Sequence, residues 1–242
     1  MPELRHLAGR VWLYPYDPDP GNVQGGVAVI ARDGGSVLVD AGNSPDAARR
    51  VAAAIEMAGL PAPRQLVYTH HHWDHVWGAC AWPDVEIIGH RAGARILAAE
   101  ARRPWSHRYL REQVEAEPRL GPSFRARAWA MPSWEGFRVL PPHTEFADVL
   151  TLPGGIEVRH VGGGHAEDSA VVAVPDEGVL LVGDSFYPPP LHLREPDDGY
   201  DLPLLRRLLD EMPSGPYDWY VDSHGEPQRA DTLRELLARP SA

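Results

Sequence analysis

The chain has 242 residues, of which 43% are hydrophobic, and it carries 34 acidic against 23 basic residues for a formal net charge of −11. That hydrophobic content excludes a disordered chain, and the length suits a single domain spanning residues 1–242. All 23 basic residues are arginine, which excludes a lysine nucleophile, and the acidic balance argues against a nucleic-acid partner, since such partners bind basic faces.

The first twenty residues show no long apolar run behind a basic start, so we expect no secretion signal. No stretch of the chain has the length and apolarity of a membrane span, so we expect no membrane association. Cys80 is the single cysteine, which leaves no intramolecular disulfide. These features predict a cytoplasmic protein and leave its oligomeric state open.

The first elements have the signals of a hairpin followed by a helix. Residues 26–30 and 37–40 are apolar runs on either side of a Gly-Gly turn, which predicts two paired strands. Residues 45–58 predict a helix, because Ser44 can cap its start, Pro45 suits its first turn and Gly59 can end it. Short strands at 66–68 and 85–88 and a helix at 92–101 follow.

Residues 102–143 differ from the rest. They contain Trp105, Trp129 and Trp134, several arginines and many prolines, with weak periodicity and no clear strand. A segment of this kind is typical of a lid, a substrate-covering insertion or a helical excursion, and a surface insertion that only packs on the domain is the alternative. Its residues Arg102, Arg103 and Arg108 are candidates for binding a substrate carboxylate, or are solvated surface charges.

After this segment, strands resume at residue 149. Twice along the chain, strands come first and strands interleaved with helices follow. This order predicts two sheets packed together with helices outside. The expected elements are strands at 149–152, 156–161, 170–174, 179–182 and 219–222, and helices at 202–211 and 229–237.

The strongest motif is Tyr68-Thr-His-His-His-Trp-Asp-His75, directly after a predicted strand. On an extended segment His70 and His72 point to the same side, and Asp74 and His75 then enter a turn or helix start and can aim at a neighbouring point. One loop can therefore supply ligands to two adjacent metal ions. A fortuitous His-rich tract is the alternative reading.

Three further candidate ligands, His165, Asp184 and His224, each follow a predicted strand. Loops at the ends of neighbouring strands converge at one edge of a sheet, so these side chains can meet the His-rich loop. Imidazole and carboxylate are the usual ligands of catalytic zinc, and the same set also holds iron or manganese.

The segment Thr69–His75 resembles the T-H-x-H-x-D-H signature of the metallo-β-lactamase superfamily. Gly164-His165, Gly183-Asp184 and Ser223-His224 follow in the superfamily's order, and Val37–Gly42 resembles its strand ending in D-x-G. The resemblance extends over residues 25–225. It implies an α/β (α+β) fold, a four-layer αββα sandwich of two mixed β-sheets flanked by helices.

The resemblance also implies the role of each ligand. Two Zn²⁺ ions are expected, with iron or manganese as alternatives, and Asp184 would bridge them. Asp40 would orient a metal ligand without binding the metal itself, and His71 would have no ligand role. The first metal would be bound by His70, His72 and His165, and the second by Asp74, His75 and His224.

The activity implied is hydrolysis of a small-molecule substrate, in which a hydroxide bridging the metals, oriented by Asp74, attacks a carbonyl. Tyr187 and His192 follow the strand that ends at the bridging ligand and are candidates for lining the substrate pocket, or belong only incidentally to the Pro-rich loop at 188–190. Asp168 is expected to be a turn residue.

Thioesters, lactones and β-lactams are the substrate classes that the resemblance suggests. The absence of lysine, the absence of a leader and Asp184 in place of a cysteine argue against an antibiotic-resistance lactamase. A thioesterase of the glyoxalase II type or a lactonase fits better. The alternatives are an iron-dependent oxidoreductase or sulfur dioxygenase, and a non-enzymatic binding protein, which the retention of all seven ligands argues against.

Overall fold

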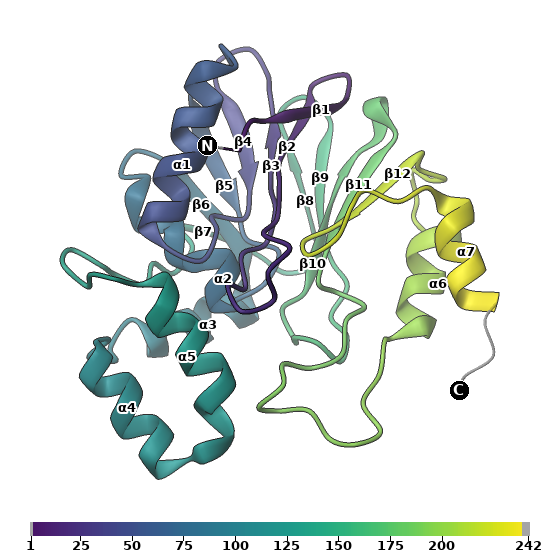
Figure 1. Cartoon of the computed structure of the whole chain (residues 1–242). Helices are drawn as coiled ribbons and strands as arrows, with labels where there is room; N and C mark the ends of the chain where they lie inside the picture. Colours follow the sequence, from purple (N-terminus) through teal and green to yellow (C-terminus); the bar gives the residue numbers. More distant parts are fainter. Residues whose placement is uncertain (1, 239–242) are drawn as a thin grey trace.

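Two β-sheets face each other and helices cover their outer faces in this computed structural model, which describes residues 2–238 (Figure 1). Met1 and residues 239–242, which the expected single domain included, lie outside the described residues. One sheet has seven strands and the other has five. The predicted αββα sandwich with two mixed sheets is therefore confirmed.

The seven-stranded sheet follows chain order from β1 to β7. Its first four strands pair antiparallel and include the predicted hairpin, whereas the last four pair parallel. Three of its strands, β1, β2 and β7, were not predicted. The strands are β1 (Arg5–Ala8), β2 (Val11–Tyr14), β3 (Val27–Ile30), β4 (Ser36–Val39), β5 (Pro63–Val67), β6 (Glu86–His90) and β7 (Thr144–Phe146).

The first helix on the outer face of this sheet begins and ends at its predicted signals to within a residue. In α1 (Pro45–Met57), the Ser44 side chain accepts the Ala47 N–H at 3.2 Å, and Gly59 takes a left-handed φ of +66° just after the end. The other elements here are α2 (Trp73–Val76), the 3₁₀ helix η1 (Trp77–Ala81) and α3 (Arg91–Glu100).

The five-stranded sheet has the order β12-β11-β10-β9-β8. Its strands pair antiparallel except for β11 and β12, which are parallel. All five strands and both helices match the predictions to within a residue. They are β8 (Val149–Leu152), β9 (Ile156–His160), β10 (Ala170–Val174), β11 (Val179–Gly183), β12 (Trp219–Asp222), α6 (Leu202–Asp210) and α7 (Ala230–Ala238), with a 3₁₀ turn η3 (Pro175–Glu177) between β10 and β11.

Buried apolar side chains hold the two sheets together. Alternate residues of each strand point to opposite faces, so Ile30 and Val37 of the first sheet meet Val158, Val172 and Leu181 of the second in one central cluster. The remaining faces pack on helices, as Leu180 does on α6. The sandwich thereby holds the strand ends at a fixed distance from one another, which is the requirement for a rigid site between them.

The segment 102–143 contains two helices, α4 (His107–Ala116) and α5 (Gly121–Ala130), joined by the 3₁₀ turn η2 (Pro118–Leu120). A helical excursion was one of the predicted forms. The prediction that strands resume only at residue 149 is wrong, because β7 pairs with β6 directly after this segment. At three residues, β7 is too short to show the alternating pattern by which strands are recognised.

No helix among residues 2–238 combines the length and the apolarity that crossing a bilayer requires.

Candidate metal centre

The seven predicted ligand side chains come together between the two sheets. They lie just past the carboxyl ends of β5, β9, β11 and β12, five of them on loops and Asp74 and His75 in the one-turn helix α2. Within the described part of the chain their donor atoms form two groups, each with all atoms within 4.8 Å of one another. One group is His70, His72 and His165, and the other is Asp74, His75, Asp184 and His224.

The first group consists of three imidazole nitrogens that face a common point. His72 Nδ1 lies 2.9 Å from both His70 Nε2 and His165 Nε2, and the latter two atoms are 3.2 Å apart. Burial, followed by the neighbouring histidines, holds the pKa of His70 and of His72 well below the ordinary value. These rings are therefore neutral at pH 7, the form in which histidine binds a metal.

The second group contains two carboxylates and two imidazoles, and each imidazole faces both carboxylates. His224 Nε2 is 3.2 Å from Asp74 Oδ2 and 3.3 Å from Asp184 Oδ2, while His75 Nε2 is 3.3 and 3.5 Å from the same two oxygens. Asp184 Oδ2 also lies 3.5 Å from His165 Nε2. Asp184 is thus the carboxylate that contacts both groups.

The charges of neighbouring side chains determine the direction of the pKa shifts in this second group. Burial alone would raise the pKa of Asp74 and Asp184, but the facing His75 and His224 outweigh it and hold both carboxyl pKa values well below the usual range. Burial likewise opposes protonation of His224, yet Asp184 and Asp74 raise its pKa to about 10. The same carboxylates, with Asp40, raise the pKa of His75 well above the ordinary value.

Asp40 fixes the loop that carries most of the donors. Its backbone has a left-handed φ of +65°, which aspartate tolerates better than most residues. Its carboxylate accepts the Thr69 N–H at 2.8 Å and the Thr69 hydroxyl at 2.9 Å, and His75 Nδ1 donates to it at 2.8 Å. The last bond leaves His75 Nε2 facing the second group, which agrees with the orienting role expected for Asp40.

Other hydrogen bonds orient the remaining rings. His70 Nδ1 donates to Thr69 Oγ1 at 3.1 Å, and His165 Nδ1 donates to the Pro188 carbonyl at 2.9 Å. In both rings Nε2 is left free to face the first group. His71 is turned aside, and its Nδ1 donates to Asp168 at 2.7 Å. Asp168 lies in a turn, as expected, but it is also buried and holds His71 away from the centre.

Two buried atoms at the centre have no hydrogen-bond partner among the described residues, His75 Nε2 and Asp184 Oδ1. Buried polar atoms are normally satisfied, and an unsatisfied one costs about 1–3 kcal/mol. A bound cation would satisfy them, and imidazole and carboxylate are ligands that hold divalent metal ions such as zinc, iron or manganese. The residues present therefore fit a pair of divalent metal ions.

A cavity of about 620 Å³ opens onto the donors. Five of the seven line it, namely His72, Asp74, His165, Asp184 and His224, and so do Tyr187 and His192, the two predicted substrate contacts. Helix α5 forms part of its wall. This volume is that of a site for a small organic molecule.

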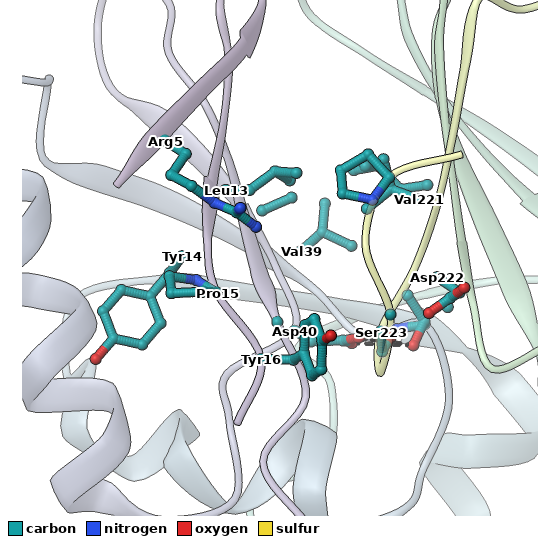
Figure 2. A pocket seen from close by; sticks show the side chains of 17 residues that line it. Arg5, Leu13, Tyr14, Pro15, Tyr16, Val39, Asp40, Val221, Asp222 and Ser223 are labelled. Carbon is teal, nitrogen blue, oxygen red and sulfur yellow. Dashed lines mark hydrogen bonds between the residues drawn. The ribbon is translucent and has the colours of Figure 1, made fainter. Parts of the chain in front are cut away.

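A second cavity, of about 30 Å³, lies between the sheets and is shown in Figure 2, where Asp40, Asp222 and Ser223 border it together with Leu13 and Val39. None of the seven donors lines it. Its volume admits a water molecule but no substrate. It borders residues that position the donors, since Asp222 accepts the His224 N–H at 3.0 Å. Of these two cavities, only the larger one reaches the donors and has room for a small organic molecule.

The arginines proposed from the sequence as carboxylate ligands do not line the larger cavity. Arg103 pairs with Glu100 at 3.7 Å and Arg108 with Glu112 at 2.7 Å, both on the surface. The arginine that lies buried in the wall is Arg127 of α5, which sequence reasoning missed. The weak hydrophobic periodicity of this segment gave no local signal that separates Arg127 from the other arginines around it.

Comparisons with known proteins agree with this geometry. The profile of the family described as Metallo-beta-lactamase superfamily matches residues 20–224. Two curated relatives, hydroxyacylglutathione hydrolases of Xanthomonas euvesicatoria pv. vesicatoria and Xanthomonas axonopodis pv. citri, are 41% and 38% identical over 66 residues. Each match covers 26% of this chain and 24% of the relative, so it spans only about a quarter of the relative's length.

Solved structures share the fold over nearly the whole chain. A metallo-beta-lactamase from Hirschia baltica has a TM-score of 0.65 at 21% identity, covering 99% of both chains. One from Pontibacter korlensis has a TM-score of 0.66 at 22% identity, covering 98% of this chain and 97% of the other. At these identities the likeness shows the fold alone. The sandwich, the two donor groups between its sheets and the family match over most of the sequence show that this chain belongs to the metallo-beta-lactamase superfamily.

Proposed function

We propose that the protein is a binuclear metal-dependent hydrolase of small carbonyl substrates. His70, His72 and His165 would hold one divalent ion, Asp74, His75 and His224 would hold the other, and Asp184 is placed to serve both. The observation that carries the proposal is the contact of Asp184 with both donor groups at a cavity of about 620 Å³. Zinc is the proposed metal, because imidazole and carboxylate are the usual ligands of catalytic zinc.

When bound, such a pair of ions supplies a water nucleophile at neutral pH and polarises the substrate carbonyl. The protein's own groups position the reactants. Asp74 lines the cavity and stays ionised, so it accepts a hydrogen bond from the attacking water and orients it. Tyr187 stays protonated, since burial and the nearby Asp222 raise its pKa, and its ring lies beside that of His224.

His192 is the proposed hydrogen-bonding contact for substrate. Burial, with help from Arg127 and Arg119, lowers its pKa, so the ring is neutral at pH 7. Its Nδ1 is buried and has no hydrogen-bond partner among residues 2–238. A substrate carbonyl or N–H group in the cavity would satisfy this ring.

Thioesters and lactones are the proposed substrates ahead of β-lactams. The 66-residue similarity to hydroxyacylglutathione hydrolases supports a thioester. The whole-chain likeness to metallo-beta-lactamases is a likeness of fold and carries no substrate with it.

The test is a hydrolysis screen of the zinc-loaded protein with aryl thioesters, lactones and β-lactams. We expect turnover of a thioester or lactone that is lost with a chelator and restored by zinc. A His165→Ala variant is expected to be inactive, whereas a variant at the exposed Glu226, Glu226→Gln, serves as the matched control. Absence of turnover of all three classes by protein of full zinc content would overturn the proposal.

Metal binding is expected to release protons. The metal-free centre holds His224 with a pKa of about 10 and His75 with a pKa well above the ordinary value, so both rings are protonated at pH 7. Only the neutral ring binds a metal, so zinc displaces about two protons, and its apparent affinity rises about tenfold per pH unit for each of them. Calorimetry in two buffers of different ionisation enthalpy measures this number, and release of no protons would contradict the ligand assignment.

Replacing Asp40 by asparagine is expected to lower zinc affinity about 10- to 100-fold with the fold retained. Asparagine tolerates the left-handed backbone and fills the same space, but it weakens the charged bond that orients His75. Competition with a chromogenic chelator measures the affinity. Asp33→Asn, in an exposed hairpin turn, is the control, and equal affinity in both variants would show that Asp40 does not orient the ligand.

A further inference from the structure

Arg127 is a buried arginine in the wall of the larger cavity. Its side chain extends from α5 and its guanidinium carbon lies 5.2 Å from the ring centre of Trp73, 5.6 Å from that of Trp77 and 4.7 Å from that of Phe124. The residue is 9% exposed and borders the cavity that the metal donors also line. An arginine is almost never buried unless its charge is compensated.

No carboxylate among the described residues pairs with this guanidinium, although the more distant Glu100 and Asp74 favour its charged form. Arg127 donates to the Ser123 hydroxyl, its Nε has no partner, and it forms no ion pair within 4.0 Å, whereas the nearby Arg103 and Arg108 each pair with a glutamate. Burial lowers the pKa of Arg127 to about 10, which leaves it protonated at neutral pH. The aromatic rings stabilise the cation only in part, by about 0.5–2 kcal/mol each. The guanidinium therefore retains free capacity to bind an anion.

Three arginines and three aspartates border the cavity around Arg127, namely Arg125, Arg127, Arg194, Asp19, Asp74 and Asp184. Two divalent ions would add four positive charges to this balance and make the cavity cationic, although the whole chain is acidic. Apolar groups such as Trp129 and Leu191 form other parts of its wall. A ligand that matches these surfaces has an apolar body and one anionic group. Guanidinium matches carboxylate, because its planar fork of N–H donors can bind both oxygens.

We propose that Arg127 binds a carboxylate of the substrate and that the enzyme therefore prefers carboxylate-bearing acyl compounds to neutral ones. The proposal rests on the proposed function, because it assigns the substrate class of the same cavity. It adds a specificity residue that comes from the inserted helix α5, outside the loops that hold the metal donors. The buried cation is held on Trp73, directly before the donor Asp74, so the carboxylate is bound at a fixed place relative to the reacting carbonyl.

The test measures binding, so that it does not depend on turnover. Titration calorimetry compares 4-phenylbutyrate with its neutral amide on the zinc-loaded full chain, for the wild type, Arg127→Gln, Arg127→Lys and Arg108→Gln. Arg108→Gln removes one arginine of the same segment that lies outside the cavity, so it is matched in net charge. Zinc content and thermal midpoint are measured for each variant.

We expect the wild type and Arg108→Gln to bind the carboxylate at least about tenfold more tightly than the amide. Arg127→Gln is expected to lose about 10- to 100-fold in carboxylate affinity while its amide affinity changes less than about threefold. Arg127→Lys keeps the charge without the planar fork and is expected to fall between them. It keeps the test decisive should the glutamine variant not fold.

Equal carboxylate preference in folded, zinc-loaded Arg127→Gln would overturn the proposal, because another cation or the metal would then bind the carboxylate. A wild type without preference would overturn it as well. Hydrolysis of neutral thioesters without any carboxylate preference would leave the hydrolase assignment standing and remove only the role of Arg127. Conversely, carboxylate binding through Arg127 without hydrolysis of any substrate would remove the proposed function and keep the binding site.

Discussion

An Asp184→Asn variant is expected to lose on the order of 10³-fold in kcat/KM, which corresponds to about 4 kcal/mol of transition-state stabilisation. Asp184 Oδ2 lies 3.3 Å from His224 Nε2 and 3.5 Å from His165 Nε2, so one carboxylate serves both donor groups. The amide has the same shape but no charge, and it therefore holds neither ion as tightly. Steady-state kinetics on the best thioester or lactone, with zinc content measured in parallel, tests this.

Asp84→Asn is the matched control, because it makes the same change at an exposed position outside the cavity. It is expected to keep wild-type kinetics and zinc content. If Asp184→Asn also kept two zinc ions and activity within about tenfold of the wild type, Asp184 would not join the two groups. The assignment of a shared carboxylate would then be wrong.

A Trp77→Ala variant is expected to lose about 3–5 kcal/mol in free energy of unfolding. Trp77 is fully buried, and its ring centre lies 4.9 Å from that of Trp105, 5.6 Å from that of Trp134 and 5.0 Å from that of Phe137. These three rings belong to the segment 102–143, so Trp77 attaches the inserted helices to the helical turn beyond the donor loop. Urea unfolding followed by far-UV circular dichroism measures the loss.

Trp129→Ala removes an equally large ring that is 77% exposed, and its unfolding free energy is expected to change by less than about 0.5 kcal/mol. A loss of under about 1 kcal/mol in Trp77→Ala would show that the inserted helices are not anchored at this tryptophan. The lid that the sequence offers as one form of residues 102–143 stays a prediction.

The sequence predicted which seven residues form the two donor groups, because this prediction needs only the order of neighbouring residues and the positions of the strand ends. His70, His72, Asp74 and His75 share one loop, and the other three donors each follow a strand, so their convergence needs only that the strands end at a common edge. The helix α1 was predicted with both ends for a similar reason: Ser44 and Gly59 act on their nearest neighbours.

What the sequence did not show depends on contacts between distant residues. The strand β7 is defined only by its pairing with β6, and β1 by its pairing with β2, since neither has a long alternating pattern. The role of Arg127 depends on Trp73 and Trp77, some fifty residues earlier, which cover its guanidinium. In the sequence Arg127 is one of several arginines in a segment of weak periodicity, and nothing local separates it from the surface-paired Arg108.

The most direct test of the binuclear centre is elemental analysis of the purified full-length protein beside a His72→Ala variant. We predict about two zinc ions per chain in the wild type, falling to about one or fewer in the variant, because His72 Nδ1 lies 2.9 Å from the other two nitrogens of its group. One or two iron ions per chain would contradict the zinc hydrolase and favour the oxidoreductase alternative. No bound metal after reconstitution, or equal zinc in both proteins, would contradict the ligand assignment itself.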